Sequence, residues 1–189
     1  VDETYVNDHL KGRALDRLAR PMAVVATDLA TGEAVVFRSG NTGTAVHASS
    51  AVPGAFKPVR IGARDYVDGG LTHPVPVRAA RAMGADIVIA VNVGTPLLKR
   101  DQITDIFGVT GQMLSILTEQ NVQASLASLK ATDVLISPDL NDYSTADFDN
   151  LPQIEPLGEA AARAMSERLA QLSVPPAEYA ALRQRQVAA

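Results

Sequence analysis

Residues Tyr66-Val67-Asp68-Gly69-Gly70 place a carboxylate at the point where a short β-branched run meets two glycines. Glycines allow unusual backbone conformations and the close approach of a neighbouring group. In open α/β sheets, ligands collect beyond the carboxyl ends of strands. An acid held there could serve as a general base beside a nucleophile. The local sequence alone favours a structural interpretation, because Asp before Gly is common in turns, where its carboxylate bonds its own backbone.

A Ser–His–acid triad is a second hypothesis. The histidines are His9, His47 and His73, and His47 stands beside Ser49 and Ser50. The chain contains no G-x-S-x-G nucleophile elbow. Because triads are defined by geometry and these histidines carry no further signal, surface or capping roles are favoured.

Metal and nucleotide sites find little support. Neither H-E-x-x-H nor the EF-hand pattern occurs, and G-x-G-x-x-G and the P-loop are also absent. The loop 40–43 before a helix is a weak candidate for anion binding at a helix N-terminus. We expect no cofactor and no metal. The aspartates weighed as metal ligands are Asp65 and Asp68 near His73, and the later cluster Asp139, Asp142, Asp147 and Asp149.

Composition limits the classes of partner. The 189 residues are 47% hydrophobic and 20% charged, with a net charge of −4, which is typical of a globular domain without affinity for nucleic acid. Cysteine is absent, which excludes disulfides, zinc–thiolate sites and a Cys nucleophile. No apolar run approaches the ~18–20 residues of a membrane helix.

Alternating strands and helices must position these groups. Two hairpins are predicted, one from strands 22–26 and 33–38 and one from 59–61 and 64–67. The unbroken apolar run 87–93 is typical of a strand covered on both faces in a parallel sheet. The sequence therefore predicts an α/β fold layered around a mostly parallel sheet. The remaining predicted elements are a strand at 133–137 and helices at 4–19, 44–50, 74–83, 101–131, 155–172 and 177–187.

The predicted helix 101–131 carries an apolar stripe. Core packing is favoured over a lipid-facing surface for this stripe. Its members are Ile103, Ile106, Phe107, Thr110, Met113, Leu114 and Leu117.

Four blocks occur in an order that resembles bacterial patatin-like phospholipases. They are 23–33 (AVVATDLATGE), 45–59 (AVHASSAVPGAFKPV), 66–77 (YVDGGLTHPVPV) and 83–93 (MGADIVIAVNV). Two positions depart from the family pattern: His47 replaces a usual Arg, and Asn92 replaces a frequent Asp. The resemblance covers residues 20–95 specifically and the remainder loosely.

The resemblance implies a three-layer αβα fold with a mostly parallel central sheet. It also implies a lipid acyl hydrolase that cleaves carboxylic esters through a Ser–Asp dyad, with phospholipase A or lysophospholipase specificity. Asp68 matches the dyad base, and Gly69 and Gly70 match the rest of its motif. The dyad serine of the family lies in an upstream G-x-S-x-G segment that this sequence lacks.

We therefore expect residues 1–189 to be the C-terminal portion of one patatin-like domain, with core blocks 20–95 and a helical region 101–189. An upstream segment of about a hundred residues would supply the serine and further strands. The expected substrate is a lipid or lysophospholipid met through transient contact with a membrane surface, in bacterial cytoplasm or periplasm. The competing hypotheses are a non-catalytic regulatory or interaction module on the same scaffold and, less favoured, a nucleotide-binding α/β domain.

Overall fold

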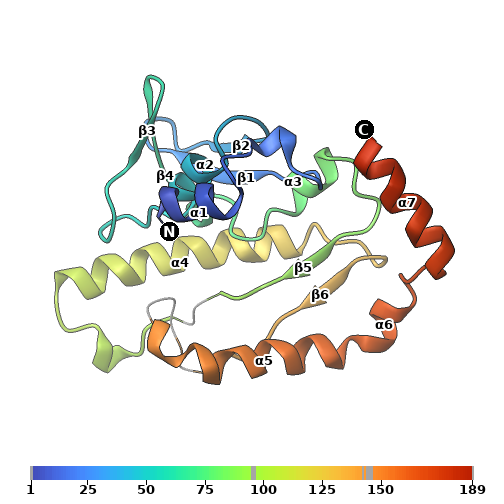
Figure 1. The fold of residues 1–189 in the computed structure, drawn as a ribbon. Coiled ribbons are helices and arrows are strands. Elements are labelled where there is room, and N and C mark those ends of the chain that lie inside the picture. The colour runs from blue at the N-terminus through green and yellow to red at the C-terminus, as the bar shows by residue number, and fades with distance from the viewer. Residues whose placement is uncertain (1, 95–96, 142, 144–146, 189) are drawn as a thin grey trace. The chain divides into compact units, whose positions relative to one another are not determined.

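The structure, a computed structural model, describes residues 2–94, 97–141, 143 and 147–188 (Figure 1). It contains two compact units, Val1–His73 with Val174–Ala189, and Pro74–Ser173. The first unit comprises α1 (Glu3–His9), β1 (Val24–Asp28), β2 (Ala34–Phe37), α2 (Thr42–Ser49), β3 (Val59–Ile61), β4 (Arg64–Asp68), α7 (Pro176–Ala188) and the 3₁₀ turns Leu15–Arg17 and Gly69–Leu71. The second comprises α3 (Val77–Ala82), β5 (Ile89–Val91), α4 (Ile106–Leu126), β6 (Val134–Ile136), α5 (Leu151–Ala164), α6 (Ser166–Ala170) and the 3₁₀ turns Arg100–Gln102 and Phe148–Asn150.

The first unit is built on a four-stranded sheet in the order β2-β1-β4-β3, and every pairing in it is antiparallel. Short turns join β1 to β2 and β3 to β4, and Gly32 and Gly62 in these turns adopt positive φ. Because so short a connection can only reverse the chain, both predicted hairpins form. The α/β class is confirmed, but the prediction of a mostly parallel sheet is wrong for this part of the chain.

Helix α2 packs on this sheet through small residues. Ala45 belongs to a buried apolar cluster with Leu15 and Val24, and Ala48 belongs to one with Ala26 and Tyr66. Alanines let the helix approach the sheet closely, so the strand ends of β1 and β4 are held in a rigid frame.

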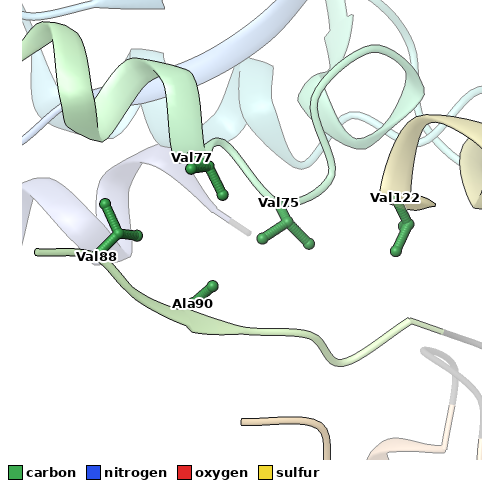
Figure 2. Packing of buried hydrophobic residues seen from close by; sticks show 5 residues of the cluster. All are labelled: Val75, Val77, Val88, Ala90 and Val122. Atoms are coloured by element: carbon green, nitrogen blue, oxygen red, sulfur yellow. The ribbon is translucent and has the colours of Figure 1, made fainter. Parts of the chain in front are cut away.

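The second unit contains the parallel pairing that the sequence predicts. β5 pairs with β6 in register Ile89↔Val134 to Val91↔Ile136, and the crossover between them includes α4. Its core is a cluster of five small apolar residues that point toward one another in Figure 2. They come from α3 and the segment before it, from β5 and the residue before it, and from α4: Val75, Val77, Val88, Ala90 and Val122.

Two apolar surfaces of the second unit are exposed where the sequence predicts that they are covered. Ile89 and Val91 are about half exposed, at 50% and 52%, so only the Ala90 face of β5 is covered by the described residues. The α4 stripe is also exposed instead of packed, with Ile106 at 71% and Met113 at 60%. Phe107 belongs to this predicted stripe, but its side chain lies outside the described part of the structure.

The predicted first helix is shorter than its periodicity suggested. α1 ends at His9, after which Lys11 and Gly12 adopt positive φ and the Gly12 amide donates to the Asn7 carbonyl at 2.7 Å. Glycine past the last turn stops a helix in this way, so the apolar spacing that continues to residue 19 does not extend it.

Other helix boundaries shift as well. α4 begins at Ile106, because the Asp105 side chain caps it by accepting from the Gly108 amide at 2.8 Å. The helix predicted over 155–172 is divided at Met165 into α5 and α6. Among the described residues, no helix has both the length and the hydropathy that a membrane span requires.

Candidate functional site

Asp68 is the last residue of β4, and its main chain is held on two sides. It pairs with Ala26 of β1, and its amide donates to the Ala51 carbonyl at 3.0 Å. The backbone that carries the carboxylate is therefore fixed by both the sheet and the segment that follows α2.

The Asp68 carboxylate is partly buried and caps the 3₁₀ turn Gly69–Leu71. Its Oδ1 accepts a hydrogen bond from the Gly70 amide at 2.6 Å. Burial raises the pKa of this carboxyl, and the Gly70 amide offsets the rise only in part. The ionised form is thus a stronger base than an ordinary aspartate, and a second oxygen is available to another donor.

Close contact with backbone requires glycine at position 69, whereas a side chain at position 70 would displace the Asp68 carboxylate. A Cβ at Gly69 would lie 2.1 Å from the Val25 carbonyl oxygen, and one at Gly70 would lie 2.9 Å from Asp68 Oδ1. Neither residue has a positive φ. Of the two reasons the sequence offered for this pair, close approach is the one that operates.

Two threonine hydroxyls that the sequence analysis missed bond to the same turn. Thr27 Oγ1 donates to the main-chain oxygen of Asp68 at 2.9 Å and lies 3.0 Å from Thr72 Oγ1. Thr27 is 4% exposed. The available signal was a threonine directly after the apolar run 22–26, because a hydroxyl buried there needs a partner.

Asp28, at the end of β1, is also buried but serves the β1–β2 turn. Its Oδ1 accepts from the amides of Ala30 and Thr31, and its Oδ2 lies 3.0 Å from Arg64. Burial raises the pKa of Asp28, but these donors outweigh burial and lower it overall. A pocket lined by Asp28, Thr31 and Arg64 opens beside this turn, and Asp68 does not line it.

Of the residues in the triad hypothesis, His9 and Ser50 have local partners. His9 Nδ1 lies 2.9 Å from the Tyr5 carbonyl, and its ring lies against that of Tyr5 in a tilted arrangement, with 4.1 Å between the centroids. Ser50, the residue that follows α2, donates through its Oγ to the Val46 carbonyl of that helix at 2.7 Å. His73 Nδ1 is buried and has no hydrogen-bond partner among the described residues. Nothing in these contacts supports a triad.

The metal and anion hypotheses also lack support. The part of the chain that the structure describes contains no group of three His, Cys, Asp or Glu that could hold a metal ion. Asp142 of the predicted cluster lies outside the described residues. At the N-terminus of α2, the Gly43 and Thr44 amides already donate to Asn7 and Asn41, which leaves these two amides unavailable to an anion.

Comparison with known proteins gives one family. The model of the patatin-like phospholipase family matches residues 3–81. An uncharacterized NTE family protein of Mycobacterium tuberculosis is 36% identical over 88 residues, which cover 47% of this chain and 24% of the relative. A second NTE family protein of that organism is 27% identical over 171 residues, covering 79% and 29%. Lysophospholipase NTE1 of Debaryomyces hansenii is 25% identical over 174 residues, covering 80% and 11%.

The chain thus spans about a quarter of the length of the mycobacterial relatives. The matched region 3–81 contains β1, α2, β4 and the turn that carries Asp68. Through these residues, which make up less than half of the chain, it is similar to the patatin-like phospholipase family.

Proposed function

We propose that the protein containing this chain is a serine-type lipid acyl hydrolase that cleaves carboxylic esters of phospholipids or lysophospholipids. The chain would be the C-terminal portion of one patatin-like domain, and the nucleophilic serine would lie on an upstream segment. Transient contact with a membrane surface would deliver the substrate. The family match and the similarity to lysophospholipase NTE1 support this substrate class.

Asp68 would be the general base of a Ser–Asp dyad. Its carboxylate takes the serine proton while the hydroxyl oxygen attacks the ester carbonyl, and backbone amides hold the resulting oxyanion. Collapse of this intermediate expels the alcohol, which receives the proton from Asp68. A water then gives its proton to Asp68 and attacks the acyl-enzyme, and the serine recovers its proton as the fatty acid leaves.

The observation that carries the proposal is the state of the Asp68 side chain. It is partly buried, its pKa is raised by burial, and its Oδ1 accepts a hydrogen bond from one main-chain amide, that of Gly70. By contrast, the structural aspartate Asp28 has several donors and a lowered pKa. A carboxylate with spare acceptor capacity and raised basicity suits a base better than a turn cap.

The test is hydrolysis of lysophosphatidylcholine micelles and of p-nitrophenyl esters by the full-length protein. Asp68→Asn removes the base and should lower kcat about 10²- to 10⁴-fold. Asp65→Asn is the matched control, because Asp65 lies on the same strand and pairs with exposed Arg60. It should leave kcat within about twofold, since exposed ion pairs contribute little.

Unchanged hydrolysis by Asp68→Asn would exclude the dyad assignment. The alternative is a non-catalytic regulatory or interaction module on the same scaffold. A full-length protein that binds the micelles but hydrolyses neither substrate would establish that alternative.

A further inference from the structure

The turn that carries Asp68 is attached to β1 at several points. Ala26 pairs with Asp68 in the sheet, and the Val25 carbonyl leaves no room for a Cβ at Gly69. Thr27 adds the side-chain contact, through its hydroxyl bond to the main-chain oxygen of Asp68. Three consecutive residues of β1 therefore contact the Asp68-Gly69 backbone.

The two threonine hydroxyls form a directed chain. A hydroxyl carries one proton, and the Thr27 proton is donated to the Asp68 main-chain oxygen at 2.9 Å. Thr72 Oγ1, at 3.0 Å, is then the donor to Thr27, which is a shorter contact than its 3.4 Å approach to the Gly69 carbonyl. Both ends of the 3₁₀ turn Gly69–Leu71 are thus connected to one buried side chain of β1.

We propose that Thr27 and Thr72 are positioning residues for the Asp68 carboxylate. They hold the turn so that the Gly70 amide and the carboxylate keep their relative orientation while the base exchanges its proton. This role rests on the proposed function. Displacement of a catalytic group by about 1 Å can cost 10²-fold in rate, so loss of the Thr27 hydroxyl should lower kcat at least about tenfold.

A merely stabilising hydroxyl is the competing explanation, and the chain offers a matched control for it. Thr42 is fully buried, and its hydroxyl donates to the Arg13 carbonyl at 2.7 Å, joining two segments distant in sequence. Thr42→Val removes the same chemical group with the same burial. It should lower the midpoint of thermal unfolding while kcat stays within about twofold, because the Thr42 hydroxyl donates to the Arg13 carbonyl and not to the Asp68 turn.

The experiment compares Thr27→Val, Thr27→Ser, Thr72→Val and Thr42→Val in the full-length protein. Four quantities are measured: kcat and KM for lysophosphatidylcholine, the unfolding midpoint, and the rate of hydrogen–deuterium exchange in the peptide spanning residues 66–73. Thr27→Val should lower kcat with KM unchanged and accelerate exchange in this peptide. Thr27→Ser, which retains the hydroxyl, should restore both, and Thr72→Val should give a smaller effect in the same direction.

The proposal is overturned if Thr27→Val lowers kcat no more than Thr42→Val does, or if Thr27→Ser fails to restore it. If Thr27→Val does not fold, Thr72→Val, at a less buried position, decides the question. Unchanged kcat and unchanged exchange in Thr72→Val would reject the positioning role. Failure of the proposed function has a separate signature. Asp68→Asn would then leave hydrolysis unchanged, while Thr27→Val would still accelerate exchange over residues 66–73.

Discussion

Asp28 and Asp68 end adjacent strands of one sheet, yet their surroundings shift the two pKa values in opposite directions. Both are subject to burial, which raises a carboxyl pKa. Asp28 receives the amides of Ala30 and Thr31 and the guanidinium of Arg64, whereas one amide, that of Gly70, offsets burial at Asp68. Hydrogen bonds thus compensate the burial of the Asp28 carboxylate fully, whereas the burial of the Asp68 carboxylate is compensated only in part, as expected for a functional group.

Asp68→Asn should therefore stabilise the protein at neutral pH. The folded-state pKa of Asp68 lies above its unfolded value. The contribution of this carboxyl group to folding stability is therefore fully present at pH values below the unfolded pKa, and it is lost as the pH rises through the folded pKa. Asn is neutral at every pH and keeps an oxygen for the Gly70 amide. Thermal unfolding measured from pH 3 to 8 should show a higher midpoint for Asp68→Asn at pH 7, and a difference that shrinks toward pH 3.

Asp28→Asn is the opposite control for this measurement. Its lowered pKa makes the ionised form favourable in the folded state, so this substitution should lower the unfolding midpoint at pH 7. The interpretation fails if Asp68→Asn also destabilises at pH 7. A gain in stability together with a loss of kcat is the pattern expected where function requires an unfavourable charge.

Among individual residues, the sequence identified those whose contacts are local. Asp68 and its two glycines are adjacent, and the capping bond between Asp68 and Gly70 spans only two residues. The Thr27 hydroxyl escaped prediction because its partner is a main-chain carbonyl 41 positions away, and one sequence does not reveal such a contact.

Among the elements, Asp133 connects three parts of the second unit. It accepts hydrogen bonds from the Lys130 amide at 2.7 Å, the Val88 amide at 2.9 Å and the Arg81 guanidinium of α3. The Lys130 amide, joined by Val88 and Arg81, outweighs burial and lowers the pKa of Asp133 to about 2. This side chain therefore joins α3, the approach to β5 and the start of β6.

Asp133→Asn should destabilise the protein at neutral pH and lose this effect in acid. The folded-state pKa of Asp133 lies below its unfolded value of 3.8, so the ionised carboxylate stabilises the folded protein at pH values above 3.8. This contribution disappears as the pH falls through about 2. Urea unfolding at pH 7 should give a lower midpoint for the variant, with convergence on the parent near pH 2. Asp86→Asn, at an exposed position nearby, should leave the midpoint unchanged. Equal effects of both substitutions would refute the connecting role of Asp133.

Elements were predictable where turn chemistry or run length decided them. The hairpins follow from glycines at Gly32 and Gly62, and the parallel pairing of β5 with β6 follows from two apolar runs separated by a helix. Sheet orientation was not predictable from the pattern, because the β1–β4 pairing depends on contacts between distant segments. The first helix was overextended because periodicity does not register a stop at Gly12.

For the whole molecule, the most informative feature is apolar surface left exposed in the unit Pro74–Ser173. Ile89 and Val91 are half exposed on β5, and Ile106 and Met113 are more exposed on α4. The 21 residues of α4 include a single charged residue, Glu119, so the helix lacks the basic face typical of membrane-surface helices. Such surface is characteristic of an interface, which here would be completed by the proposed upstream segment.

The chain of 189 residues produced alone should consequently bind the hydrophobic dye ANS and self-associate, whereas the full-length protein should do so much less. Light scattering after size exclusion measures the mass, and dye fluorescence measures the exposed surface. Replacing both Ile106 and Met113 by Gln should reduce dye binding by the short chain, because these side chains contribute to the patch. Leu29→Gln, at an exposed turn position of the other unit, is the control and should change it little. A stable monomer of 19.9 kDa without dye binding would show that this surface needs no cover, and would count against an upstream segment packed on it.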